Sequence, residues 1–183
     1  MNYILLLIAV CLLLIGMSAL LSLIMMRIPP LPSTPSVIKK IITQISATPF
    51  SLTITEIGSG YGYMLFRLAK AFPDRKIVGI EISLIPFLFS YMIKILGNFK
   101  NVQIIYGNAF TIIKKKSIPC QIVVGYLTGS RVLNHLEKLY CDKISDILIL
   151  NTYPLKNIQP TKTIHNLDIF KSALYFYQKE NHS

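Results

Sequence analysis

Charged side chains are scarce in this chain of 183 residues: they make up 15% of it, whereas a soluble domain usually carries about 25%. The shortage is local, because residues 1–26 contain no Asp, Glu, Lys or Arg. Hydrophobic residues make up 52%, which excludes a disordered chain, since such chains are poor in large apolar side chains. The length suits one domain with a short appendage.

Cysteine is also rare, with three residues in the chain. Cys11 lies in the apolar first segment, and neither Cys120 nor Cys141 has a CxxC partner or a histidine at zinc-finger spacing. These absences exclude a disulfide scaffold and predict free thiols in a reducing compartment. No pair of histidines or acids has metal-ligand spacing, so we expect no bound metal.

The first segment is an uninterrupted apolar run from Tyr3 to Met26. As a helix it would be roughly 36 Å long, enough to cross a hydrocarbon core of about 30 Å. A signal peptide would have a basic start and a shorter apolar core, and a buried helix would have a polar face. The run therefore predicts a transmembrane anchor over residues 1–27, in contact with lipid through residues 3–26.

The charges that flank this segment predict its orientation. Arg27, Lys39 and Lys40 follow the run, and no cation precedes it, so the positive-inside rule puts the following domain in the cytoplasm. We expect a single-pass membrane protein, and the bacterial inner membrane is favoured over an organelle membrane. The net charge of +11 favours attraction to an anionic leaflet. No basic helix with interleaved aromatics is visible, so nucleic acid is not expected as a partner; the oligomeric state stays open.

Four prolines lie within the segment from Pro29 to Pro35. Proline at this density excludes a helix and favours extended polyproline geometry. The sequence predicts a short stiff linker over residues 28–35, followed by one domain over residues 36–183.

Hydrophobic periodicity predicts alternating strands and helices in this domain. The expected helices are Ser36–Ser46, Tyr63–Ala71, a helix capped by Ser83 that runs to Leu96, and Arg131–Tyr140. The expected strands are Ser51–Ile57, Lys76–Ile82, Asn101–Tyr106, Gln121–Leu127, Asp146–Asn151 and Ala173–Gln178. Such alternation indicates an α/β fold with a parallel sheet covered on both faces. Ligands of these folds bind outside the carboxyl ends of the strands.

A glycine-rich turn, Glu56-Ile57-Gly58-Ser59-Gly60-Tyr61-Gly62, joins the first strand to a helix. Glycines here let a ligand approach the backbone and leave the amides of the helix start accessible. The turn departs from the dinucleotide fingerprint, because its third glycine comes one position early, and it lacks the G-K-[ST] of a P-loop. An acid directly before the turn suits a ligand with an ammonium group.

Two further strand ends carry polar residues. Glu81 stands about 20 residues beyond the glycine turn, where an acid in nucleoside-binding α/β folds accepts the ribose hydroxyls. The third strand ends in Gly107-Asn108-Ala109, where a polar side chain could reach an adenine edge, although a plain turn would look the same.

These motifs resemble those of class I S-adenosyl-L-methionine-dependent methyltransferases over residues 36–183. EIGSGYG looks like their first motif, GIEIS like their acidic second motif and YGNAF like their adenine-side motif. More narrowly, PPLPSTP, VVGYLTGSRVLNHLEKL, NTYPL and LYFYQK are similar to segments of small relatives of archaeal protein-lysine methyltransferases and of the mitochondrial ATP-synthase c-subunit lysine methyltransferase. The resemblance implies a Rossmann-like class I sheet.

By this resemblance the cofactor is S-adenosyl-L-methionine and the turn binds its methionine end. The implied cofactor-binding residues are Glu56, Gly58, Ser59, Gly60 and Gly62 for the methionine end, Glu81 and Ile82 for the ribose, and Asn108 and Ala109 for the adenine. Tyr126 would line the methyl-transfer pocket and is the one candidate catalytic residue.

The implied substrate is a membrane-proximal protein, with a lysine side chain as the acceptor. Tyr61 and Tyr63 replace an acid and an arginine of the relatives, and Asn108 and Gln121 each stand where aspartate is usual. These departures leave two alternatives open: a methyltransferase for a lipid, quinone or other small amphiphile, and a non-catalytic cofactor-binding protein.

Overall fold

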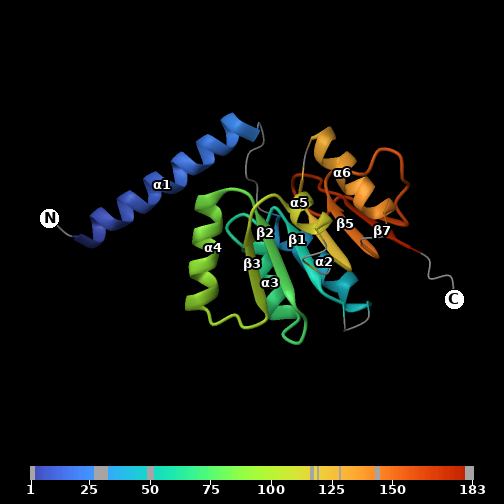
Figure 1. Ribbon diagram of the computed structural model, residues 1–183, viewed down its shortest axis with the longest axis horizontal. Helices are drawn as coiled ribbons and strands as arrows, with labels where there is room; N and C mark the ends of the chain where they lie inside the picture. Colours follow the sequence, from blue (N-terminus) through green and yellow to red (C-terminus); the bar gives the residue numbers. More distant parts are fainter. Residues whose placement is uncertain are drawn as a thin grey trace.

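The computed structural model describes residues 3–26, 33–48, 52–115, 118, 120–127, 129–142 and 145–179, and the side chains of the first helix as far as Met17. The helices are α1 Tyr3–Met26, α2 Pro35–Ser46, α3 Tyr63–Ala71, α4 Leu84–Leu96, α5 Ala109–Lys114 and α6 Ser130–Cys141. The strands are β1 Ile54–Ile57, β2 Ile77–Glu81, β3 Val102–Tyr106, β4 Ile122–Gly125, β5 Ile147–Asn151, β6 Lys162–Ile164 and β7 Leu174–Gln178. Figure 1 shows these elements as an α/β domain from which α1 projects.

The strands form one seven-stranded sheet in the order β3-β2-β1-β4-β5-β7-β6. The first five strands are parallel, whereas β7 is antiparallel to β5 and β6 is antiparallel to β7. The expected parallel sheet is therefore confirmed for β1 to β5 and wrong for β7, the last predicted strand. Within the described residues no helix lies between β5 and β7, and a parallel return would need such a crossover.

Helices cover both faces of the sheet, as the alternating pattern predicts. On one face α2 and α3 pack against side chains from six of the strands in one buried cluster, and α4 packs on β2 and β3. On the other face α5 and α6 pack against the alternate residues of the same strands in a second cluster. The parallel strands are buried on both faces, which explains their nearly continuous apolar sequences.

Most element bounds agree with the sequence expectation within three residues, and α3 agrees at both ends. Two elements were not predicted. Helix α5 is a six-residue turn whose sequence, AFTIIK, has no long helical period. Strand β6 has three residues and no fully buried side chain, so it lacks the apolar pattern on which strand prediction depends.

The first apolar segment forms α1, a single helix of 24 residues from Tyr3 to Met26. It contacts α4, and Figure 1 shows its N-terminal end reaching beyond the edge of the domain. Over the residues that the structure describes, no helix combines the length and the hydropathy that crossing a membrane requires.

The predicted linker ends in two residues that are fixed to the domain. The Ser33 hydroxyl accepts a hydrogen bond from Asn151 Nδ2 at 3.3 Å, and the Thr34 hydroxyl donates to Asp168 at 2.7 Å. Thr34 also caps α2, which begins at Pro35. Residues 28–32 of the predicted linker lie outside the described residues.

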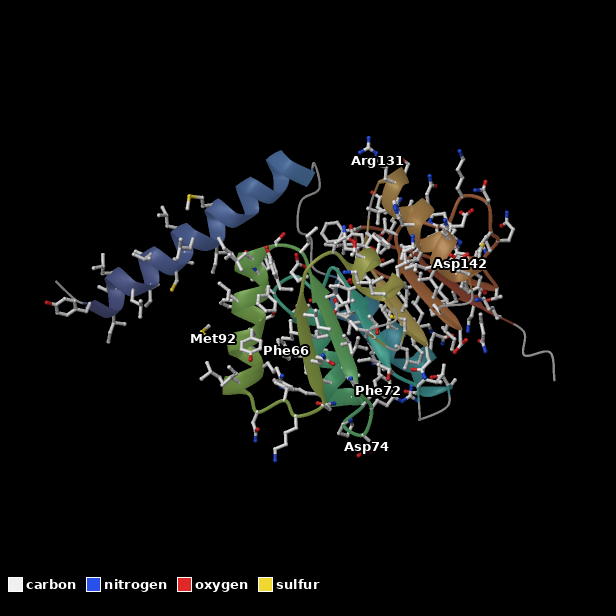
Figure 2. The ribbon with its side chains drawn as sticks, in the orientation of Figure 1. Phe66, Phe72, Asp74, Met92, Arg131 and Asp142 are labelled. Carbon is white, nitrogen blue, oxygen red and sulfur yellow. The ribbon has the colours of Figure 1, made fainter. Side chains whose placement is uncertain are left out.

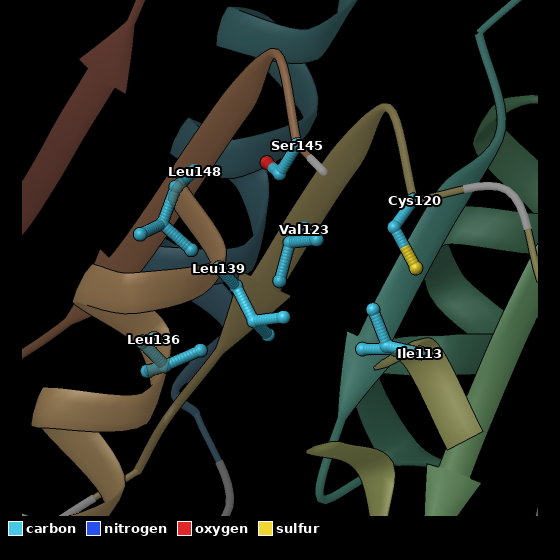
Figure 3. A pocket seen from close by; sticks show the side chains of 7 residues that line it. All are labelled: Ile113, Cys120, Val123, Leu136, Leu139, Ser145 and Leu148. Carbon is cyan, nitrogen blue, oxygen red and sulfur yellow. The ribbon is translucent and has the colours of Figure 1, made fainter. Parts of the chain in front are cut away.

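A small hollow lies between α5, α6 and the sheet, away from the carboxyl ends of the strands (Figure 3). Apolar side chains and Ser145 line it, and it leaves no space for a water molecule. Cys120 contributes its thiol, whose pKa is raised by burial, so the sulfur stays protonated at neutral pH. The hollow is a packing gap and not a ligand site.

The Tyr177 hydroxyl generates a prediction about stability. This fully buried side chain accepts a hydrogen bond from the Leu155 backbone N–H at 2.8 Å. Tyr177→Phe should lower the free energy of unfolding by about 1–3 kcal/mol, because it leaves a buried N–H without an acceptor. Urea unfolding followed by circular dichroism measures the change. Tyr175→Phe, two residues away and half-buried, is the matched control and should change it by less than about 0.5 kcal/mol.

Candidate functional site

The glycine turn lies at the carboxyl end of β1, beside the point where the strand order reverses between β1 and β4. Gly58, Gly60 and Gly62 have φ of +72°, +53° and +84°, in the left-handed region that disfavours other residues. The Gly58 and Ser59 N–H groups donate to the Ile80 carbonyl at 2.9 and 3.2 Å. These bonds hold the turn against β2.

The three glycines differ in what surrounds them. A Cβ added to Gly62 would collide with the Phe66 ring, and one added to Gly58 would lie 3.0 Å from Leu127. A Cβ at Gly60 would meet no described atom within 4 Å. Two glycines therefore allow close packing inside the protein, whereas Gly60 borders open space in which a ligand can lie.

Glu81 connects the ends of β1 and β2. Its Oε2 accepts a hydrogen bond from the Gly60 N–H, and its Oε1 accepts one from the Ser83 N–H, each at 2.7 Å. The side chain is buried, yet an ionised carboxylate has about four acceptor positions. Each oxygen can therefore hold its backbone amide and still accept from a ligand hydroxyl.

Glu56 has a carboxyl oxygen whose hydrogen-bond partner a ligand could supply. It is buried within β1, and its Oε2 has no hydrogen-bond partner in the described residues. Burial raises its pKa well above the ordinary value, and the charge of Glu81 raises it further. The Ser59 hydroxyl, within the turn, is buried and also lacks a partner in the described residues. A cationic ligand group near Glu56 would remove the energetic cost of ionising it.

The other predicted site residues lie at the ends of neighbouring strands. Ile82 directly follows β2 and is exposed, Ala109 is the buried first residue of α5, and Tyr126 follows β4 and is half-buried. Asn108 has a structural role that was not foreseen. Its Oδ1 caps α5 by accepting from the Phe110 and Thr111 N–H groups at 3.0 and 3.3 Å, and the residue is exposed.

Sequence reasoning missed two features of this edge. The Tyr61 ring packs edge-to-face on Phe89 of α4 at 5.5 Å, so the glycine turn contacts a helix that follows the next strand. Asn151 ends β5 and binds Ser33, and Thr152 next to it has a φ of +74°. The polar end of the apolar ILILN strand signalled the Asn151 position, but its partner 118 residues away had no sequence signal.

Comparisons with known proteins agree with this geometry. A family model described as "Putative methyltransferase" matches residues 51–124. An RNA methyltransferase from Salinibacter ruber, solved with S-adenosyl-L-homocysteine, is 18% identical with a TM-score of 0.66, over 84% of this chain and 96% of its own. A precorrin-6y C5,15-methyltransferase from Geobacter metallireducens is 16% identical with a TM-score of 0.55, over 69% of this chain and 66% of its own. An S-adenosylmethionine-dependent methyltransferase from Aquifex aeolicus is 12% identical with a TM-score of 0.55, over 76% of this chain and 87% of its own.

Among curated proteins, none matches the chain. At the identities found, the solved structures show that the chain has the class I methyltransferase fold. The fold and the matched family together support an S-adenosylmethionine-dependent methyltransferase, with S-adenosylmethionine as the cofactor.

The residues present fit this cofactor. Glu56 offers a buried carboxyl oxygen without a partner, which suits the ammonium group of the methionine end. Gly60 borders the open space that the ligand needs, and Glu81 retains acceptor positions for ribose hydroxyls. Methyl transfer from a sulfonium needs no metal, and in the described residues no group of His, Cys, Asp or Glu could hold one.

The difference between Gly60 and Gly62 gives a matched pair of substitutions. Alanine at either position adopts a left-handed backbone, at a cost of roughly 1–2 kcal/mol. Gly62→Ala should lower the free energy of unfolding further, because its Cβ displaces the Phe66 ring. Gly60→Ala should instead weaken S-adenosylmethionine binding at least about tenfold, which is about 1.4 kcal/mol, since its Cβ enters the ligand space. Urea unfolding measures the stability of each variant, and calorimetry measures its affinity for S-adenosylmethionine. If Gly62→Ala weakens binding as much as Gly60→Ala does, this assignment is wrong.

The raised pKa of Glu56 makes stability depend on pH. Because the folded protein binds this proton more tightly than the unfolded chain, the stability contributed by Glu56 is present below the ordinary pKa of 4.5 and is lost as pH rises through the raised value. Relative to Glu56→Gln, the native protein should lose free energy of unfolding as pH rises above 4.5. Unfolding at a series of pH values measures this difference.

The same proton reports on the ligand. If the cofactor ammonium lies near Glu56, binding should release a proton. The affinity for S-adenosylmethionine should then increase as pH rises from 4.5 towards the raised pKa of Glu56. Calorimetry in two buffers of different ionisation enthalpy detects the release, which Glu56→Gln should abolish. Equal proton release from both proteins would place the ammonium elsewhere.

Proposed function

We propose that this protein is a membrane-anchored methyltransferase that methylates a protein at the membrane surface, with a lysine side chain as the acceptor. The cofactor supplies an electrophilic methyl group on a sulfonium sulfur. The residues of the chain bind it, orient it towards the acceptor and keep water out. The single observation that carries the cofactor part is the carboxyl-end cluster of Glu56, Gly60 and Glu81.

The anchor rests on the N-terminal segment. Helix α1 has 24 residues and no charged side chain, and its described side chains are largely exposed. Exposed apolar side chains in such number are unfavourable in water and favourable in lipid. The cations that follow α1 in the sequence, beginning with Arg27, support a cytoplasmic domain.

The position of the cofactor site, at the carboxyl ends of the strands, supports a membrane-proximal acceptor. Ser33 and Thr34 bind Asn151 and Asp168, and Asn151 ends β5 at the same edge of the sheet as the glycine turn. Six residues, 27–32, separate α1 from Ser33. The chain thus leaves the domain at the edge where the cofactor binds, and the short connection keeps this edge close to α1.

The residues around the cofactor site suit a lysine acceptor. A lysine must lose its proton before it can accept a methyl group, and apolar surroundings assist by disfavouring the ammonium form. Tyr126 after β4 and Tyr153-Pro154 after β5 contribute aromatic and apolar surface at this edge. The alternative is a lipid, quinone or other small amphiphile, which the same closeness to the membrane favours.

Labelling of membranes that contain the full chain tests the acceptor. Tritium from methyl-labelled S-adenosylmethionine should appear in the protein fraction, and acid hydrolysis should recover it as methylated lysine. Label in the lipid extract would favour the alternative, and label in nucleic acid alone would contradict both.

Glu81→Ala is the control for this labelling. Loss of hydrogen bonds to a charged acceptor, each worth about 1.5–3 kcal/mol, should weaken cofactor binding roughly 10- to 1000-fold. Transfer should fall at low cofactor concentration and recover partly at high concentration. Glu81→Gln retains one acceptor oxygen and should lose less. Unchanged labelling by Glu81→Ala would mean that the label comes from another enzyme.

A further inference from the structure

The outer surfaces of α4 and α6 differ sharply. These helices have 13 and 12 residues and cover opposite faces of the sheet. The exposed positions of α6 are polar except for Cys141 at its end, and Figure 2 labels Arg131 near its start and Asp142 just beyond its end. In contrast, Met92 of α4 points away from the sheet in the same view. The polar surface of α6 is the normal one for a helix on a water-soluble domain.

The exposed side of α4 is almost entirely apolar. Twelve large apolar side chains outside α1 are exposed in the described residues, and six of them lie on this one helix. Their exposed fractions run from 42% to 78% with α1 in place. We call these six residues the α4 face: Leu84, Leu88, Tyr91, Met92, Ile95 and Leu96. Their spacing puts them on one side of the helix, opposite Pro86 and Ser90, which are buried against the sheet.

Three lysines border the α4 face, and the acid Asp74 lies near one of them, Lys100. The chain has no Asp or Glu between Glu81 and Glu137. Lys94 lies 5.7 Å from the Tyr91 ring, Lys70 lies 5.9 Å from the Phe99 ring, and Lys100 is exposed just beyond the helix. Apolar side chains bordered by lysines are typical of helices that lie in the interface of an anionic membrane.

From these observations we propose that α4 is a second membrane contact, with its face inserted at the level of the lipid headgroups. The inference deepens the proposed membrane anchoring, because α1 contacts α4 and the two apolar surfaces adjoin. Aliphatic side chains enter the acyl region while the lysine ammonium groups reach anionic phosphates. A second copy of the chain fits less well, because two α4 faces brought together would also bring their lysines together.

The absence of tryptophan from the chain allows a direct test. Leu88→Trp and Ile95→Trp each introduce a single fluorophore into the α4 face, and Asn134→Trp introduces one into the exposed side of α6 as the matched control. Leu12→Trp reports on α1. The full chain is reconstituted into vesicles of phosphatidylcholine and phosphatidylglycerol, with or without lipids that carry a doxyl quencher on the acyl chain. Acrylamide in the buffer probes access from water.

The Leu88→Trp and Ile95→Trp proteins should show blue-shifted emission, loss of intensity with doxyl lipid and little quenching by acrylamide. The Asn134→Trp protein should show the reverse. Equal quenching ratios for the α4 and α6 reporters would overturn the proposal. Protection of the α4 reporters from both quenchers would also overturn it, because a protein surface would then cover the face. Loss of lipid quenching at Leu12→Trp alone would contradict the anchor but not the α4 contact, so the two failures are distinguishable.

Discussion

The carboxylate of Glu81 is the contact on which the geometry of the site depends. It accepts 2.7 Å hydrogen bonds from the Gly60 amide in one loop and from the Ser83 amide at the start of α4. Without it, two half-buried backbone N–H groups would lose a charged acceptor, and the loops after β1 and β2 would no longer be held together. The open space beside Gly60, where the ligand is expected, exists because this acid holds the loop in place.

Two acids lie close together at the carboxyl ends of β1 and β2, and they differ in whether their oxygens have hydrogen-bond partners. Glu81 has backbone partners for both oxygens, whereas Glu56 is buried with one oxygen unpaired and has a raised pKa. Their mutual repulsion adds to the raised pKa of Glu56. This arrangement is costly in the free protein and becomes favourable when a cation is bound. Glu81 therefore maintains the shape of the site, and Glu56 favours the binding of a positively charged ligand.

The features that depend on local sequence were predictable, and those that depend on distant partners were not. The turn from Glu56 to Gly62 and helix α3 follow from glycine spacing and apolar period, and both were located correctly. The capping role of Asn108 was not foreseen, because it depends on the N–H groups at the start of α5, from which its side-chain oxygen accepts hydrogen bonds; its contact with a ligand stays a prediction.

The remaining misses have the same origin. The antiparallel position of β7 and the bond between Ser33 and Asn151 are set by how segments far apart in sequence meet. Hydrophobicity alone could not reveal the exposed side of α4, because its exposed positions are mostly apolar while its two buried positions are Pro86 and the polar Ser90.

The fixation of Ser33 to the end of β5 has a consequence for how acceptors would be found. A connection of six residues spans at most roughly 25 Å when fully extended, so an anchored domain would search a thin layer along the bilayer. Acceptors confined to the same membrane would arrive by diffusion in two dimensions, at an effective concentration set by the tether. Weak recognition of each acceptor would then suffice, and selectivity would come from confinement more than from contact area.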